Sequence, residues 1–87
     1  MEVSFSPNFL REFHSLPPLL QEEIMEKLER FSDVENHRAL KVHKLSGRLR
    51  DCHALSVNYH VRILFQFVGK PRRAYLLSVG DHDIYSR

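Results

Sequence analysis

The sequence predicts an α+β fold in which a short strand and two helices precede three or four mainly antiparallel strands, with both helices on one face of the sheet. Two observations support this prediction. Between residues 7 and 31, apolar residues recur every three or four positions, the period of amphipathic helices. From residue 40 onward they alternate with polar residues, the period of strands. At 87 residues the chain can build one core, so we expect a single domain over residues 1–87.

The N-terminal half should begin with a strand over residues 2–5 and a helix that starts at Pro7. Ser6 is a favoured helix cap, and proline suits the first helical position because no N–H donor is needed there. Pro17 and Pro18 separate this helix from a longer one. The two apolar stripes consist of Phe9, Leu10 and Phe13, and of Leu20, Ile24, Leu28 and Phe31. Carboxylates of the second helix lie four residues before basic side chains, so we interpret them as a solvated face without a catalytic pair.

The C-terminal half should contain the remaining strands. We expect strands at residues 41–45 and 49–56, joined by a Ser-Gly turn, and at residues 60–67 and 73–79. The sequence GKPR between the last two is typical of a turn, so these two strands should form an antiparallel hairpin.

Strand alternation predicts which side chains face away from the helices. If the apolar residues at 61, 63, 65 and 67 contact the helices, His60 and Arg62 must lie on the opposite, open face. Cys52 and Ala54 are small and suit the helix side, which would place His53 on the open face. The other residues assigned to the open face are Leu49, Asp51, Ser78, Gly80 and His82, with Leu77 and Val79 buried.

Charge is distributed unevenly along the chain. Residues 1–37 hold three Lys/Arg against eight Asp/Glu, a net charge of −5, whereas residues 38–87 hold ten against three, a net charge of +7. Five of the six histidines lie at or beyond this changeover. The basic half is therefore either a polyanion-binding surface or a solvated basic one.

Cysteine content and hydropathy indicate the cellular setting. Cys52 is the only cysteine, so the chain has no internal disulfide and no cysteine-based zinc site, and a reducing cytoplasm suits it. The first residues, MEVSFSPNFLREF, carry no basic leader, and no apolar run approaches the roughly 18 residues of a membrane span. We expect a soluble cytoplasmic protein with no membrane partner.

The segment HKLSGRLRDCH, residues 43–53, concentrates two histidines and three cations. A zinc site is one interpretation, but the histidines at 43, 53, 60 and 82 include no closely spaced pair, and the neighbouring arginines would repel a dication. Scattered surface histidines are another. Phosphodiester cleavage fits the same residues better, because one imidazole can accept a proton while another donates one, and an arginine can stabilise charge on the phosphorus centre. RNA supplies its own 2′-OH nucleophile, so we expect no metal and no cofactor.

At these residues the sequence resembles the RelE/ParE superfamily of bacterial and archaeal toxins, and within it the RelE-type mRNA endonucleases of the histidine-using, YafQ-like branch. The order of strand, two helices and strands covers nearly the whole chain. The motifs that carry the resemblance are HKLSG at 43–47, RDCH at 50–53, VRILFQF at 61–67 and SVGDHDIY at 78–85.

The resemblance implies a toxin of a type II toxin-antitoxin system that cleaves mRNA on the ribosome, by attack of the 2′-OH on the adjacent phosphate. It implies catalytic roles for His43, His53, Arg62, His82 and Tyr85. On this basis His82 would donate a proton to the leaving oxygen and His53 would accept the 2′-OH proton with help from His43. Arg62 would stabilise the phosphorane and Tyr85 would stack on a base.

Further residues have supporting roles in this hypothesis. The YafQ-like branch has a functional aspartate shortly after RDxH that is missing here, and His60 falls nearest to its position as a candidate auxiliary group. The expected RNA-binding cations are Lys41, Lys44, Arg48 and Arg50. The expected partners are a cognate antitoxin protein, the ribosome and mRNA.

A different class of function is also compatible with the fold. The superfamily includes ParE-like gyrase inhibitors, and a degenerate toxin could bind an antitoxin without cutting RNA. The outward histidines and Tyr85 distinguish the two classes, because a gyrase binder has no chemical need for them.

Overall fold

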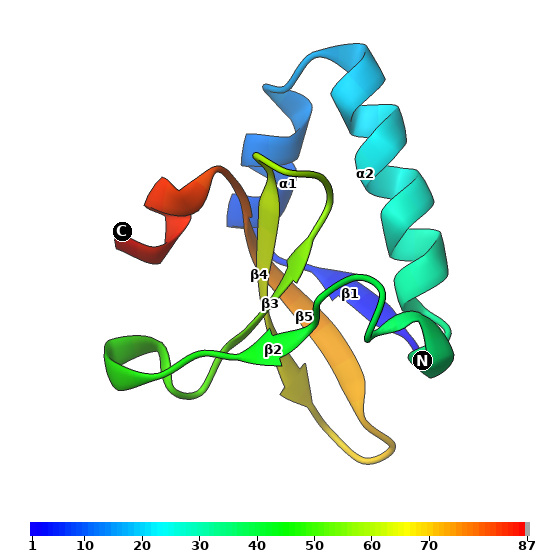
Figure 1. Cartoon of the computed structure of the whole chain (residues 1–87), viewed down its shortest axis with the longest axis vertical. Helices are drawn as coiled ribbons and strands as arrows, with labels where there is room; N and C mark the ends of the chain where they lie inside the picture. The colour runs from blue at the N-terminus through cyan, green and yellow to red at the C-terminus, as the bar shows by residue number, and fades with distance from the viewer. Residues whose placement is uncertain (87) are drawn as a thin grey trace.

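A computed structural model describes residues 1–86 and contains two α-helices and a five-stranded sheet (Figure 1). The helices are α1 (Pro7–His14) and α2 (Pro18–Phe31). The strands are β1 (Val3–Phe5), β2 (His43–Lys44), β3 (His53–Ser56), β4 (Arg62–Val68) and β5 (Arg73–Gly80). Short 3-10 turns are η1 (Val34–Asn36), η2 (Gly47–Leu49) and η3 (His82–Ser86). Within residues 1–86, neither helix is both long and apolar enough to cross a bilayer.

The sheet has the strand order β1-β5-β4-β3-β2. β1 pairs in parallel with β5, and every other neighbouring pair is antiparallel. The predicted α+β fold, with a strand and two helices before mainly antiparallel strands, is therefore confirmed. β4 lies at the centre of the sheet, so a side chain at its start is close to both flanking strands.

The start of α1 follows the prediction from Ser6 and Pro7. The hydroxyl oxygen of Ser6 accepts a hydrogen bond from the backbone N–H of Phe9 at 3.0 Å, and Pro7 occupies the first turn. The same hydroxyl donates to the carbonyl oxygen of Leu77 at 3.2 Å. The cap therefore also fixes the start of α1 against β5.

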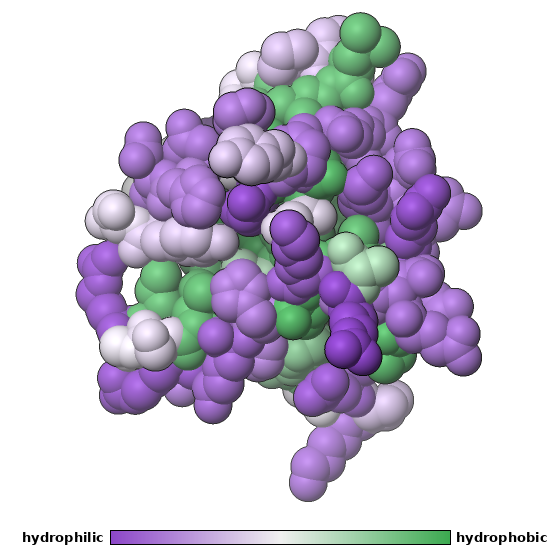
Figure 2. Space-filling model, viewed as in Figure 1, coloured by the Kyte–Doolittle hydropathy of each residue, from purple (hydrophilic) through white to green (hydrophobic). Residues whose placement is uncertain are grey.

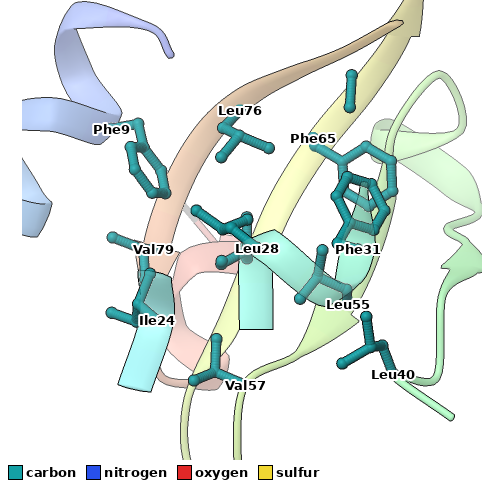
Figure 3. Packing of buried hydrophobic residues seen from close by; sticks show 12 residues of the cluster. Phe9, Ile24, Leu28, Phe31, Leu40, Leu55, Val57, Phe65, Leu76 and Val79 are labelled. Atoms are coloured by element: carbon teal, nitrogen blue, oxygen red, sulfur yellow. The ribbon is translucent and has the colours of Figure 1, made fainter. Parts of the chain in front are cut away.

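The main core lies between the two helices and one face of the sheet (Figure 3). Phe31 of α2 meets Phe65 of β4 edge to face, with ring centroids 4.9 Å apart, and both side chains have no exposed surface. Both helices contribute to this core, and so do three of the strands. Its other large fully buried side chains are Phe9, Ile24, Leu55, Ile63 and Leu76.

The opposite face of the sheet is less open than the sequence suggests. Cys52, Leu64 and Ile84 are buried there in a second, smaller core. The chain around η2 and the C-terminal turn η3 lie over this face, on the side of the sheet away from α2 (Figure 1). The partly buried residues that complete this core are Leu45, Leu49, Leu77 and Tyr85.

The prediction for the strand at residues 49–56 is wrong in its length and in its faces. β3 begins only at His53, because the preceding residues form η2 and a turn. His53 pairs with Phe65 and Ala54 with Leu64, so His53 lies on the helix side and Ala54 on the other. The physical reason is that Leu55 buries more apolar surface in the main core than Ala54 would, and it has no exposed surface.

The faces assigned to the last strand are also partly wrong. The register of β5 shifts opposite Leu64 and Phe65, which marks a β-bulge around Leu77. Leu77 therefore packs in the second core, and Ser78 is buried instead of facing solvent. The Ser78 hydroxyl donates to Oε1 of Glu12 on α1 at 2.6 Å. Val79 lies in the main core, as predicted.

Replacing Phe65 by alanine should remove the central contact of the main core. We expect Phe65→Ala to lower the free energy of unfolding by about 3–5 kcal/mol, the usual cost of truncating a buried phenylalanine. Urea denaturation followed by circular dichroism measures this. Tyr59→Ala is the matched aromatic control: its side chain is 85% exposed, so its change should stay within about 0.5 kcal/mol. Equal losses in the two variants would contradict the placement of the core.

Candidate functional site

A cavity of about 500 Å³ forms where β4 begins and β5 ends. His60 and Arg62, from the start of β4 and the loop before it, and His82, from the turn after β5, all line it. We call it the histidine cavity, and its remaining lining residues are Tyr59, Asp81 and Asp83. The structure thus brings together three of the residues singled out in the sequence.

The turn that carries His82 is held from within. Oδ1 of Asp81 accepts a hydrogen bond from the backbone N–H of Asp83 at 2.9 Å. The carbonyl oxygen of Asp81 accepts a hydrogen bond from the backbone N–H of Ile84 at 3.1 Å. Ile84 is only 2% exposed, in the second core. Because Ile84 is buried and the Asp81 side chain caps the turn, His82 is presented to solvent on an ordered segment.

Tyr85 lies behind His82 and is half-buried. Its ring meets the His82 imidazole edge to face, with centroids 5.9 Å apart. Burial raises the pKa of the Tyr85 hydroxyl, while the positive charge of Arg62 acts in the opposite direction. Nη2 of Arg48 donates to the carbonyl oxygen of Tyr85 at 2.9 Å. Arg48 and Tyr85 line another cavity, of about 290 Å³, and Tyr85 is not part of the lining of the histidine cavity, which it adjoins only through its contact with His82.

Asn58 organises the loop before β4, and the sequence analysis did not assign it a role. Its Oδ1 accepts hydrogen bonds from the backbone N–H groups of His60 and Val61, both at 2.9 Å. Its Nδ2 donates to Oε1 of Glu23 on α2 at 2.7 Å. Its carbonyl oxygen accepts from Nη1 of Arg62. One residue thus connects α2, His60 and Arg62; asparagine's preference for such turns, in the sequence VNYH, could have indicated it.

His53 does not reach the histidine cavity. Its ring packs against Phe67, with centroids 4.7 Å apart, and against Phe65 at 5.7 Å, on the helix side of the sheet. Its Nδ1 is buried and has no hydrogen-bond partner within residues 1–86. Burial, more than the nearby charges of Arg72 and Lys44, lowers the pKa of His53.

The other predicted residues are spread over the basic half. His43 lies on β2, two strands from β4, and its Nδ1 donates to the carbonyl oxygen of Lys41 at 2.8 Å. Lys44 pairs with His53 and shares its face. Arg50 is exposed and bonds within its own loop, to the carbonyl oxygen of Gly47 at 3.4 Å. His43 therefore does not line the histidine cavity.

The face of the molecule seen in Figure 1 is strongly polar. Figure 2 shows one face of the molecule covered mainly by hydrophilic residues, with smaller apolar patches between them. Among the residues that the structure describes, no three His, Cys, Asp or Glu side chains gather closely enough to hold a metal ion. The histidine cavity can therefore offer imidazoles, a guanidinium and exposed carboxylates to a ligand.

The lowered pKa of His53 predicts how stability depends on pH. Because the folded-state pKa lies below the unfolded value of about 6.5, the unfolded chain binds a proton more readily. Above that pH, protonation of His53 should not change the free energy of unfolding. As the pH falls below the unfolded-state pKa, the free energy of unfolding should decrease, and the decrease should stop below the folded-state pKa. Urea denaturation at pH 7.5 and pH 5 should show a smaller loss in His53→Phe, which keeps the ring packing, than in the wild type. An equal or larger loss in the variant would contradict this sign.

No family model and no curated protein matches the chain. Solved structures do match it. The RelBE2 toxin-antitoxin complex from Mycobacterium tuberculosis is 20% identical with a TM-score of 0.74, over 93% of this chain and 96% of that chain. The archaeal RelE-RelB complex from Pyrococcus horikoshii OT3 is 16% identical with a TM-score of 0.71, over 92% of each chain. YafQ from E. coli strain BL21(DE3) is 9% identical with a TM-score of 0.71, over 97% of this chain and 96% of that chain. At these identities the likeness establishes the fold, and the chain has the fold of the RelE-type toxins.

Proposed function

We propose that the chain is the toxin of a type II toxin-antitoxin system and acts in the cytoplasm as a ribosome-dependent endoribonuclease. The observation that carries the proposal is the grouping of His60, Arg62 and His82 around one cavity. The fold shared with RelE and YafQ structures supports it. Two imidazoles beside a guanidinium are the groups that metal-independent RNA cleavage requires.

The reaction needs no nucleophile from the protein. The 2′-oxygen of a ribose attacks the adjacent phosphorus atom, and the bond from phosphorus to the 5′-oxygen of the next nucleotide breaks. A base removes the 2′-OH proton, and an acid protonates the departing 5′-oxygen. The products are a 2′,3′-cyclic phosphate and a free 5′-hydroxyl.

We assign the acid to His82 and the base to His60. His82 is exposed on the ordered turn η3, where an incoming phosphate can reach it. His53, the base expected from the sequence, packs on the helix side of the sheet and points away from that cavity. His60 lines the same cavity as His82, and Asn58 fixes its backbone, so it replaces His53 in this assignment.

Arg62 and Tyr85 complete the proposed site. Nη1 of Arg62 is held by the carbonyl oxygens of Asn58 and Val61, which fixes the guanidinium at the cavity wall. A fixed guanidinium can stabilise the charge that develops on the phosphorane oxygens. Tyr85 contacts His82 and is half-buried, so its ring is placed to stack on a base while Arg48 holds its backbone.

A protein antitoxin is the proposed partner. The net charge of +7 over residues 38–87 creates a surface that must be neutralised when the toxin is not needed. We propose that a small acidic antitoxin, encoded next to this chain, covers it with a helix or a strand. The matched RelBE2 and RelE-RelB structures are complexes of a toxin with its antitoxin.

Cleavage should depend on His60 and His82 and not on His53. We expect His60→Ala and His82→Ala each to lower the rate on ribosome-bound mRNA on the order of 100-fold or more, the usual size of an acid-base contribution. Primer extension on a reporter mRNA measures it. Because acid and base are both imidazoles, the wild-type rate should rise and then fall with pH.

His14→Ala is the matched control for this series, because His14 is an exposed histidine at the end of α1. It should cut at the wild-type rate, and so should His53→Ala if it is folded. The assignment of the base would be wrong if His53→Ala were inactive while His60→Ala remained active. Cleavage by a folded His60→Ala/His82→Ala double variant at the wild-type rate would contradict the whole proposal.

The proposed partner is tested in cells. Expression of the chain alone should arrest growth, and expression together with the adjacent acidic open reading frame should restore it and yield a co-purifying complex. A chain recovered alone at full expression, without growth arrest, would count against both the partner and the toxicity.

A further inference from the structure

A second hollow, of about 380 Å³, opens beside the end of β3, between α2 and the loop that leads into β4. Four cations line it: Lys27 and Arg30 from α2, Lys41, and Arg62. We call it the basic pocket, and its other lining residues are Asn36, Ala39, Leu40, Ser56, Val57, Asn58 and Tyr59. It therefore has no carboxylate in its lining, in contrast to the histidine cavity, where Asp81 and Asp83 are present.

The cations of the basic pocket come from different parts of the chain and meet only in the fold. Lys27 and Arg30 lie three residues apart on α2 and are therefore neighbours on its surface. Arg30 is also 3.5 Å from Glu26, but both side chains are more than half exposed, so this pair offsets little of the positive potential. The pocket thus favours an anion over a neutral or cationic ligand.

The backbone at Lys41 shows an unusual conformation for this residue type. Its φ is 57°, in the left-handed region that glycine or asparagine adopts more readily than lysine. Backbone hydrogen bonds on both sides hold this turn: Val42 N–H donates to the His37 carbonyl at 2.9 Å, and Ser56 N–H to the Leu40 carbonyl at 2.8 Å. A strained position that carries a cation in a basic pocket is consistent with a ligand that uses the charge.

The basic pocket and the histidine cavity share a wall. Arg62 and Tyr59 line both of them. Tyr59 is 85% exposed, although it is a large aromatic residue, and its ring meets that of His60 edge to face at 5.2 Å. An extended ligand that leaves the histidine cavity can therefore pass Tyr59 and continue into the basic pocket.

We propose that the basic pocket binds a backbone phosphate of a nucleotide flanking the scissile one, and that Tyr59 stacks on a base between the two hollows. This inference rests on the proposed RNA-cleaving function. A groove of cations combined with an exposed aromatic ring is how proteins bind single-stranded RNA without reading its sequence. An acidic peptide would use the cations but would have no need for the exposed ring. The basic pocket also binds a phosphate more favourably than the histidine cavity does, because Asp81 and Asp83 of that cavity repel an anion.

The test compares short and long RNA on the full chain. Fluorescence anisotropy is measured with labelled 2′-O-methyl oligouridylates of two and eight nucleotides, which cannot be cut because they have no free 2′-OH.

The variant Lys27→Gln/Lys41→Asn removes two charges from the basic pocket, and asparagine accepts the left-handed backbone at position 41. We expect this variant to bind the eight-nucleotide RNA about tenfold or more weakly and to lower the salt slope by about 1.4, because two fewer cations neutralise its phosphates. Binding of the dinucleotide should stay within about twofold, since an RNA with so few phosphates is too short to span both hollows.

Two further variants sharpen the comparison. Lys70→Gln removes an exposed charge in the β4–β5 turn, outside both hollows, and should leave binding of the long RNA nearly unchanged. Tyr59→Ala should weaken binding of the long RNA without changing the salt slope, because stacking releases no counterions.

Three results would overturn the inference: equal losses for both RNA lengths, a loss no larger than that of Lys70→Gln, or a loss of affinity for an acidic peptide while RNA binding stays intact. The proposed function fails separately. If the wild type binds the long RNA through the basic pocket but does not cut ribosome-bound mRNA, the cleavage proposal is wrong and the pocket is an RNA-binding site without a scissile bond beside it. If it cuts normally and the double variant binds as the wild type does, only the subsite is wrong.

Discussion

The edge-to-face contact of Phe31 with Phe65 determines the arrangement of the rest of the molecule. It holds α2 on the sheet and fixes which face of the central strand β4 is buried beneath the helices. Because side chains alternate along a strand, the burial of Phe65 and Ile63 turns Arg62 out of the main core, and at the start of β4 it lines both the histidine cavity and the basic pocket beside α2. The position of the candidate arginine thus follows from a purely hydrophobic contact in the main core.

The loop before β4 transmits this arrangement to the candidate site. Asn58 bonds to Glu23 of α2 and also to the backbone of His60 and the guanidinium of Arg62. These hydrogen bonds hold the histidine backbone and the guanidinium in a defined position relative to α2. Such second contacts, made by residues that do not touch the substrate, keep reacting groups in a productive geometry.

The second small core explains how a C-terminal turn can carry a histidine in an ordered position. Ile84 is buried with Cys52 and Leu64, and Arg48 bonds to the carbonyl oxygen of Tyr85. A turn of five residues has too few internal hydrogen bonds to be stable alone, so this burial must supply its stability. Cys52, Leu64 and Ile84 therefore stabilise the turn that positions His82.

The sequence alone determined the element order, the Ser6 cap and the apolar faces of both helices, because these depend on local periodicity and on one residue's backbone preference. It also predicted, from strand alternation, that His60, Arg62 and His82 share one face. The side occupied by His53 was decided only in the tertiary structure. The register of β3 decides whether Leu55 or Ala54 faces the main core, and burial of the larger Leu55 is favoured. A shift of one residue would move every side chain of the strand to the opposite face. That His60 and His82, 22 positions apart in the sequence, line one cavity likewise depends on the long-range pairing of β4 with β5, which no local pattern contains.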